Sequence, residues 1–132
     1  MTKGAMKTRF QPDELLAAID SQDPDRFLGF LTPDARFRFG SIPAVEGASA
    51  IRGFLVPFFD GLESIQHRKS GFWEVAGDQA FLEGEVTYHY SNGREATVPF
   101  LNHFHLKDGR VHEYDIYVDP TPAIEAMNGA RS

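Results

Sequence analysis

The sequence predicts an α+β fold in which helices come first and an antiparallel sheet follows. Apolar residues recur at helical spacing as far as Gly61, and beyond it they alternate with polar residues. Asn92-Gly93 and Asp108-Gly109 divide the second half of the chain. Such dipeptides favour hairpin turns because their residues accept positive φ. We therefore expect three N-terminal helices packed into the concave face of a strongly curved sheet.

The three helices are predicted from their start and stop signals. Gln11-Pro12-Asp13-Glu14 places proline at the first helical position and acidic residues at the positive end of the helix dipole. Asp23-Pro24-Asp25 repeats this pattern, and Pro33 ends the second helix. After Gly47 a third helix is indicated by apolar residues spaced along one helix face, namely Ile51, Phe54, Leu55, Phe58 and Phe59.

The strands are predicted from two-residue periodicity. The short segment 35–39 alternates apolar and basic residues between the second and third helices. Four longer strands are expected at about 65–76, 80–90, 95–106 and 110–118. If the turn at Asn92-Gly93 has two residues, residues whose numbers sum to 185 pair across it. If the turn at 107–109 has three residues, the corresponding sum is 216.

Composition bounds the class of protein. The chain has 132 residues, 42% of them hydrophobic and 24% charged, and it fits one domain over residues 1–132 with a core at about 10–125. It contains no cysteine, which excludes disulfides, thiol catalysis and cysteine-ligated metals. Its net charge of −6 disfavours nucleic acid as a partner. No apolar run approaches the ~20 residues that span a bilayer, and no signal-peptide pattern is present. We therefore expect a cytoplasmic protein with no membrane partner.

Several motifs carry a resemblance to a known family. They are Pro33-Asp34-Ala35, Glu46-Gly47, Glu83-Gly84-Glu85-Val86-Thr87-Tyr88, Lys107-Asp108-Gly109-Arg110-Val111 and Tyr114-Asp115-Ile116-Tyr117-Val118-Asp119-Pro120. With the order of helices and strands, they resemble the SnoaL-like branch of the nuclear transport factor 2-like superfamily over about residues 10–125. The resemblance implies a cone-shaped fold. The superfamily includes isomerases, cyclases, epoxide hydrolases, dehydratases and non-catalytic binders, so the likeness alone does not select a chemistry.

The sequence departs from this family at its known catalytic positions. The general base of ketosteroid isomerase corresponds by spacing to Arg38 or Phe39, and its helix tyrosine to Leu15. Its protonated aspartate corresponds to Asn102, which keeps a hydrogen-bond donor. The aspartate of the epoxide hydrolases and cyclases corresponds to Ile116. Neither mechanism therefore transfers intact.

Strand alternation predicts a polar cluster on the inner face of the sheet, where Glu85 and His89 share a face with Asn102, and Asn102 lies opposite Tyr114. A carboxylate held against phenylalanine walls suits a general base, so Glu85 and His89 are candidate catalytic residues together with Asn102. Asn102 and Tyr114 could donate hydrogen bonds to a ligand oxygen. Simpler interpretations remain open: a solvated sheet margin for Glu85, a satisfied buried amide for Asn102 and a core aromatic for Tyr114.

An apolar cavity is expected around this cluster, although the 12 Phe residues also fit a phenylalanine-rich core. Its predicted ligand-binding walls are Leu15, Phe39, Phe54, Trp73, Phe100 and Ile116, with Tyr114 at the polar end. His67 and Trp73 share parity on the first long strand, and Trp73 is interpreted as a wall. Arg38 is either a solvated edge charge or a group that binds a ligand carboxylate.

The outer face of the sheet is predicted to pair two copies of the chain as a homodimer. It would carry Tyr88, Tyr90, Leu101, His103, His105 and Tyr117, and aromatic patches of this kind usually mark interfaces. His103 and His105 with Glu113 have a spacing that could chelate a metal. Interface or exposed histidines are the preferred interpretation, and we predict no metal site.

Two classes of function remain open. The first is a cofactor-independent isomerase, cyclase or hydrolase that acts on a small hydrophobic carbonyl or hydroxyl compound. The second is a non-catalytic ligand-binding or interaction module of the same fold. An enzyme needs an ionisable group inside the cavity, and Glu85 and His89 are the chief candidates. If both point to solvent, the binding module is the expected function. No cofactor is expected in either case.

Overall fold

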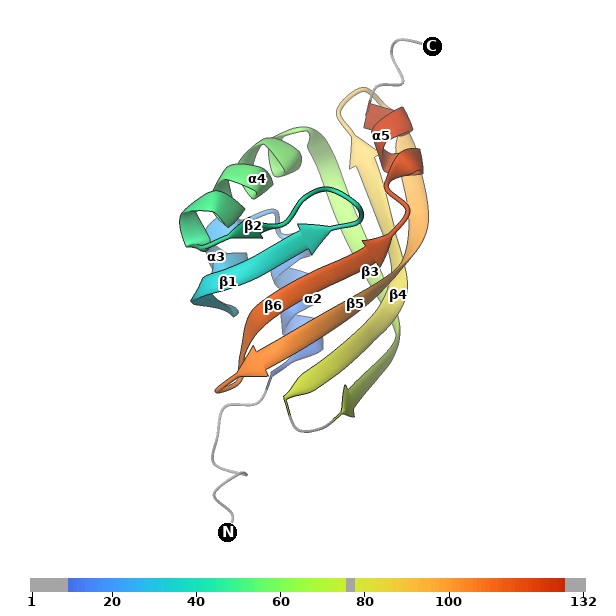
Figure 1. Cartoon of the computed structure of the whole chain (residues 1–132). Coiled ribbons are helices and arrows are strands. Elements are labelled where there is room, and N and C mark those ends of the chain that lie inside the picture. The colour runs from blue at the N-terminus through green and yellow to red at the C-terminus, as the bar shows by residue number, and fades with distance from the viewer. Residues whose placement is uncertain (1–9, 76–77, 128–132) are drawn as a thin grey trace.

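The computed structural model describes residues 10–75 and 78–127 (Figure 1). Its elements in chain order are α2 (Pro12–Asp20), α3 (Pro24–Leu28), β1 (Leu31–Phe39), β2 (Val45–Glu46), α4 (Ala48–Asp60), β3 (Leu62–Val75), β4 (Gln79–Tyr90), β5 (Glu95–Lys107), β6 (Arg110–Val118) and α5 (Thr121–Met127). Helices followed by a long antiparallel run confirm the predicted α+β class.

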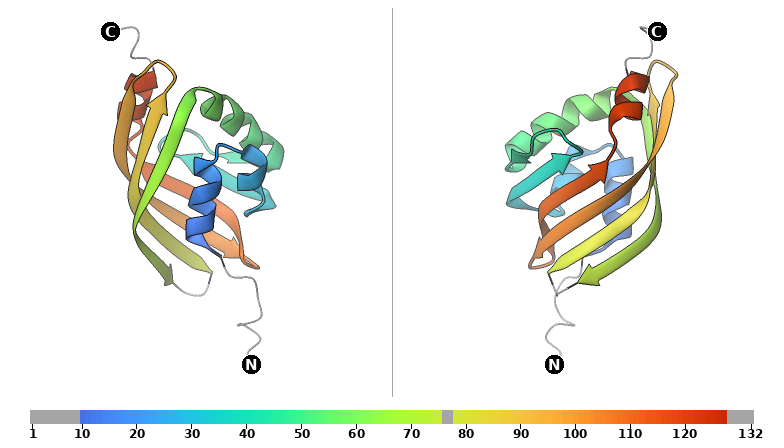
Figure 2. Two further views of the ribbon diagram at one scale, coloured as in Figure 1. Left: turned by 180° about the vertical axis from the view of Figure 1, so that it is seen from behind. Right: turned by 45° about the vertical axis from the view of Figure 1, so that its right-hand side comes forward.

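The six strands form one sheet in the order β2-β1-β6-β5-β4-β3. All neighbouring pairs are antiparallel except β1 and β6, which run parallel. Figure 2 shows α2, α3 and α4 on the same, concave side of the curved sheet. The first strand starts four residues earlier than predicted, at Leu31, so Pro33 lies within β1 instead of ending α3.

The helix starts follow the signals in the sequence. Pro12 occupies the first turn of α2. The side chain of Asp23 caps α3 by accepting hydrogen bonds from the backbone N–H groups of Asp25 and Arg26 at 3.0 and 3.3 Å. Such a cap satisfies donors that the first helical turn leaves unpaired.

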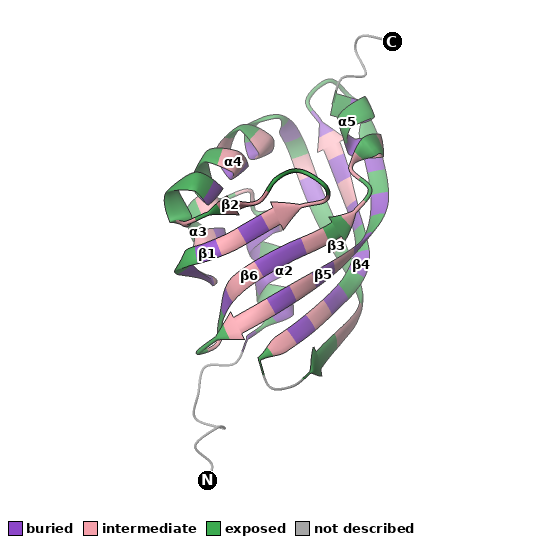
Figure 3. Cartoon of the chain, in the orientation of Figure 1, coloured by how far each residue is buried: buried purple, intermediate pink, exposed green. Residues whose placement is uncertain are grey.

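Burial alternates along the strands, which separates an inner face from an outer face (Figure 3). The inner face packs against the helices through phenylalanine and tyrosine rings. Tyr114 lies at the centre of this packing, with ring centroids 5.7 Å from Phe27, 5.3 Å from Phe37 and 4.8 Å from Phe104.

The turn between β4 and β5 corrects the predicted register. Tyr90 N–H donates to the Arg94 carbonyl at 2.8 Å, which leaves a three-residue loop instead of two. Paired residue numbers therefore sum to 184, so that Leu82 and not Glu83 lies opposite Asn102. Because side chains alternate with period two, this slip of one residue turns every β4 side chain to the opposite face from the one predicted.

The pairing of β5 with β6 also differs from the prediction, but by two residues. Asn102 lies opposite Ile116, and Phe104 lies opposite Tyr114. A shift of two residues preserves the face, so Asn102 and Tyr114 both remain on the inner side. The predicted partners of Asn102 and Tyr114 are therefore wrong, but the face on which each lies is as predicted.

A bulge bends the sheet where β3 passes β4. The β3–β4 register shifts between Lys69 and Gly71. There the two backbones come so close that a Cβ on Gly84 would lie 2.2 Å from the carbonyl oxygen of Arg68. Beyond the bulge, the Trp73 ring lies over Gly71, where a Cβ would meet the ring at 2.4 Å.

Candidate functional site

A small cavity of about 40 Å³ lies between the helices and the inner face of the sheet. Its walls are apolar and largely aromatic, and they include Phe39, Phe54, Phe58, Phe100 and Ile116. Four side chains with polar groups also line it: His67, Tyr88, Asn102 and Tyr114. An apolar cavity with a few convergent polar groups is the usual form of a small-molecule site.

His67, which lines this cavity, contacts the carboxylate of Asp20. Asp20 is the last residue of α2, and its Oδ1 lies 2.6 Å from Nδ1 of His67 on β3. The other carboxylate oxygen accepts a 3.0 Å hydrogen bond from the His67 backbone N–H. The carboxylate thus fixes both the strand and the ring. With Nδ1 engaged by Asp20, Nε2 is the nitrogen left to exchange a proton with a ligand.

The surroundings of His67 are apolar. Its side chain is only 10% exposed, and its ring meets Phe100 edge to face with centroids 5.4 Å apart. The imidazole of His67 is therefore held in one orientation by Asp20 and Phe100, and it can act as a base. The arrangement can take a proton from, or return one to, a compound in the cavity.

Asn102 and the two tyrosines supply the remaining polar groups. Asn102 is 2% exposed, and its Oδ1 has no hydrogen-bond partner among the described residues. Burial raises the pKa of the Tyr114 phenol, and the neighbouring Tyr88 and the charge of Asp20 raise it further. Burial likewise raises the pKa of Tyr88. Both phenols therefore stay protonated at neutral pH and can act as hydrogen-bond donors.

Six of the residues predicted from the sequence line this cavity: Phe39, Phe54, Phe100, Asn102, Tyr114 and Ile116. Leu15 is fully buried in the core beside them and is not part of the lining. Trp73 is 50% exposed on the outer face, so the prediction that it forms a wall is wrong. The bulge in β3 is the reason, since it reverses the parity between His67 and Trp73.

The predicted placement of Glu85 and His89 inside the cavity is also wrong. Both lie on the outer face, where Glu85 pairs with Arg68 and His89 Nδ1 lies 3.3 Å from Glu95 Oε1. The slip in the β4–β5 register accounts for both errors. The same slip turns Tyr88 and Tyr90 inward, where they are 3% and 4% exposed, so neither belongs to the outer patch.

Sequence reasoning did not assign a role to Asp20 or His67. They are 47 residues apart and lie on different elements, and no local spacing links them. The signals present were a polar residue at the end of an apolar helix and a histidine in a strand. Only the packing of α2 on β3 brings the two together.

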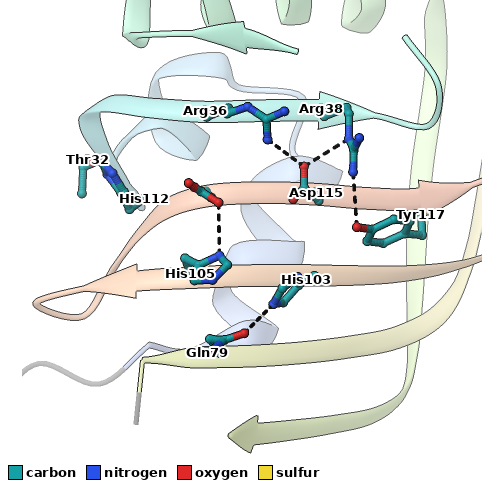
Figure 4. A network of polar contacts seen from close by, with 10 residues as sticks. Thr32, Arg36, Arg38, Gln79, His103, His105, His112, Asp115 and Tyr117 are labelled. Atoms are coloured by element: carbon teal, nitrogen blue, oxygen red, sulfur yellow. Dashed lines mark hydrogen bonds and ion pairs between the residues drawn. The ribbon is translucent and has the colours of Figure 1, made fainter. Parts of the chain in front are cut away.

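The outer face carries a second polar network, drawn in Figure 4. Nη1 of Arg36 and Nε of Arg38 lie 3.3 and 3.2 Å from the same oxygen of Asp115. Arg38 also donates to the Tyr117 hydroxyl at 3.2 Å. Arg38 therefore points away from the cavity and does not bind a ligand there. His105 contacts Glu113 at 3.2 Å, but among the described residues no three His, Asp or Glu side chains are grouped to hold a metal ion.

An open groove of about 740 Å³ lies on this outer face. It is lined by charged residues such as Arg68, Glu83 and Glu85. Arg68 and Glu85 pair with each other, and no buried ionisable group points into the groove. The smaller inner cavity is therefore the candidate site.

Comparison with known proteins identifies the family. The SnoaL-like domain family matches residues 13–114, which is most of the chain. This chain belongs to the SnoaL-like domain family. Among curated proteins, no sequence matches it.

Solved structures support the same fold for this SnoaL-like protein. TerC, crystallised with polyporic acid, is 18% identical, with a TM-score of 0.76 over 89% of this chain and 95% of its own. An NTF2-like protein of unknown function from Burkholderia pseudomallei is 20% identical, with a TM-score of 0.77 over 88% and 93%. SalBIII, an epoxide hydrolase/cyclase-like enzyme of pyran ring formation in salinomycin, is 13% identical, with a TM-score of 0.74 over 84% and 89%. At these identities the likeness concerns the fold.

Among the described residues, no helix combines the length and apolar character that crossing a bilayer requires.

Proposed function

We propose that this SnoaL-like protein is a cofactor-independent enzyme of the isomerase, cyclase or hydrolase type. It binds a small hydrophobic carbonyl or hydroxyl compound in the inner cavity and moves a proton on it. The Asp20–His67 couple at the apolar wall carries the proposal, because it is an ionisable pair held at 2.6 Å beside the space a ligand would fill. TerC, with its bound polyporic acid, and SalBIII, with its cyclase-like activity, share the fold and support a ligand of this kind.

The residues take distinct roles in this proposal. His67 Nε2 removes a proton from a carbon next to the ligand carbonyl, and Asp20 stabilises the imidazolium that forms. Negative charge then develops on the carbonyl oxygen, where a protonated phenol such as Tyr114 can donate a hydrogen bond. His67 afterwards returns the proton to a different atom, which completes an isomerisation or sets up ring closure.

The test measures proton removal directly. Exchange of the α-protons of 2-tetralone for deuterium in D₂O is followed by NMR with the wild type, His67→Gln and Asp20→Asn. General-base catalysis contributes about 10²–10⁴ in rate, so we expect His67→Gln to lose about 100-fold or more. His89→Gln is the matched control, because His89 lies on the outer face, and it should exchange at the wild-type rate. Equal rates for His67→Gln and the wild type would refute the role of His67.

A non-catalytic ligand-binding module is the second candidate. It is favoured by the apolar or basic residues at the positions that correspond by spacing to the family's bases, Arg38, Phe39 and Ile116. The outward positions of Glu85 and His89 favour it as well, since neither supplies an ionisable group to the cavity. Binding of 2-tetralone by calorimetry, without any exchange in the wild type, would select this candidate.

We also propose that the protein forms a homodimer through the outer sheet face. In support, Trp73 and Tyr117 are each 50% exposed there, and Phe81 stacks on His103 with centroids 4.5 Å apart. Light scattering at micromolar concentration should give twice the chain mass of 14.8 kDa. Leu101→Arg, in the middle of this patch, should give the monomer mass. A monomeric wild type would refute the dimer.

A further inference from the structure

The amide oxygen of Asn102 is a buried acceptor without a partner in the described part of the chain. The residue is 2% exposed on the inner face of β5, and its Oδ1 accepts no hydrogen bond from any described residue. Its neighbours across the adjacent strands, Leu82 and Ile116, are apolar and offer no side-chain donor. Folded proteins pair nearly all buried polar atoms. The partner of this oxygen must therefore come from the contents of the cavity that Asn102 lines.

The unpaired atom restricts the chemistry of its partner. A ketone or an ether offers only lone pairs, so neither can satisfy a second acceptor, whereas a hydroxyl can donate its proton. We propose that Asn102 selects ligands that carry a hydroxyl group, whose O–H donates to Oδ1. This inference rests on the proposed function and names its substrate class: phenols, hydroxy ketones and ketones that react through an enol.

The other groups at the cavity fit such a hydroxyl. Tyr88 and Tyr114 line the same space and remain protonated donors. A ligand hydroxyl could accept from one of these phenols while it donates to Asn102. In the proposed reaction His67 first takes the α-proton and leaves an enolate. When the His67 imidazolium returns this proton to the ligand oxygen, the enolate becomes an enol, whose O–H can donate to Oδ1. The acceptor thus favours the enol over the starting ketone.

The size of the cavity sets a condition on binding. An aromatic ring needs about 150 Å³, as in engineered cavities that bind benzene, and the cavity holds about 40 Å³. Phe39, Phe54 and Phe58 form a cluster in its wall, with ring centroids 6.0 to 6.2 Å apart. All three are only half-buried, so a ring can turn outward at lower cost than a core residue. Phe58→Ala should enlarge the cavity by removing one of these rings, and the two remaining rings can turn outward.

The experiment compares two probes that differ in one proton. 2-Naphthol can donate a hydrogen bond, and 2-methoxynaphthalene has the same rings and oxygen but cannot. Calorimetry measures both dissociation constants with the wild type and with Phe58→Ala, each with and without Asn102→Leu. One net hydrogen bond corresponds to about three- to tenfold in affinity. We expect 2-naphthol to bind more tightly by this factor, and Asn102→Leu to abolish the preference.

Gln79→Leu is the matched control, since it removes an amide on the outer face that contacts His103 at 2.9 Å. It should keep the preference for 2-naphthol. Thermal unfolding checks that Asn102→Leu remains folded. The preference for 2-naphthol is also measured with the wild type and with Phe58→Ala, so it does not depend on that variant.

Each contrary result overturns the inference in a specific way. Equal affinities for the two probes would mean that Oδ1 is satisfied by a buried water only. Tighter binding of the ether would mean that the amide nitrogen faces the ligand. A preference for 2-naphthol that survives Asn102→Leu would mean that another group accepts its hydrogen bond. Failure of both probes to bind, with the wild type and with Phe58→Ala, would refute the site. The deuterium exchange of 2-tetralone depends on His67, so its outcome is separate from the naphthol preference.

Discussion

Gly84→Ala is expected to destabilise the protein strongly, because Gly84 lies where the sheet bends. An alanine Cβ would lie 2.2 Å from the Arg68 carbonyl oxygen and 3.1 Å from the Lys69 Cα, whereas real Cβ contacts essentially never fall under 3.0 Å. Both obstacles are backbone atoms of β3. The two strands would therefore have to separate locally, at the point where the bulge in β3 shifts their register.

The magnitude follows from the nature of the obstacle. Adding a methylene-sized group to a packed interior costs about 1–3 kcal/mol, and we expect about 3 kcal/mol here because no side chain can rotate out of the way. For a domain of this size such a loss lowers Tm by about 10 °C. Gly71→Ala is the control: its Cβ would meet the Trp73 ring at 2.4 Å, but that ring is half exposed and can swing away. Its cost should be below about 1 kcal/mol.

Urea and thermal unfolding followed by circular dichroism measure both free energies. Equal losses for the two variants would refute the explanation that backbone contact decides the cost. A Gly84→Ala protein as stable as the wild type would show that β3 and β4 can separate freely. Gly84 also lies opposite Phe100, so we expect Gly84→Ala to weaken binding of 2-naphthol as well.

Three further substitutions test individual contacts. Burial raises the pKa of Tyr114 above its ordinary value, so the unfolded chain loses this proton first, and the free energy of unfolding falls as pH rises past about 10. In urea titrations at pH 9 to 11, Tyr114→Phe should make that fall shallower by up to about 1.4 kcal/mol per pH unit. An unchanged slope would contradict this prediction. The Thr32 hydroxyl donates to the Asp34 carboxylate at 3.0 Å and lowers the pKa of Asp34. In an NMR titration, Thr32→Val should raise that pKa toward the ordinary value. An unchanged pKa would mean that the backbone N–H of Asp34 causes the lowering. Asp23→Ala removes the cap of α3 and should cost about 1 kcal/mol of stability in urea unfolding, whereas a neutral result would mean that water replaces the cap.

The fold class could be predicted because its signals are local. Helical spacing before Gly61 and alternation after it each depend on residues within a few positions of one another. Proline and acidic residues at 12–14 and 23–25 mark helix starts that the structure confirms. Such patterns report which face of an element is buried, and that decides the class of fold.

The site could be predicted only in part, because register is not a local property. One additional residue in the β4–β5 turn moved Glu85 and His89 to the outer face. The error of two residues between β5 and β6 left Asn102 and Tyr114 on the correct face. An odd slip reverses a strand and an even slip does not. The inner face of β5 was therefore identified and that of β4 was not.

The corrected register also explains why an ionisable group would act from β3. By spacing, the acidic bases of resembling enzymes correspond to Arg38 or Phe39 and to Ile116. Arg38 points to the outer face, and Phe39 and Ile116 are direct partners in the parallel β1–β6 pairing. Both are apolar here, so this wall of the cavity has no group that could accept a proton. The inner face of β4 offers none either, since the residues there are Ala80, Leu82, Gly84, Val86 and the protonated phenols of Tyr88 and Tyr90. Within the described lining, the remaining side chain with a nitrogen that can accept a proton is His67. An enzyme built on this chain would therefore act on its ligand from β3 and not from β1 or β6.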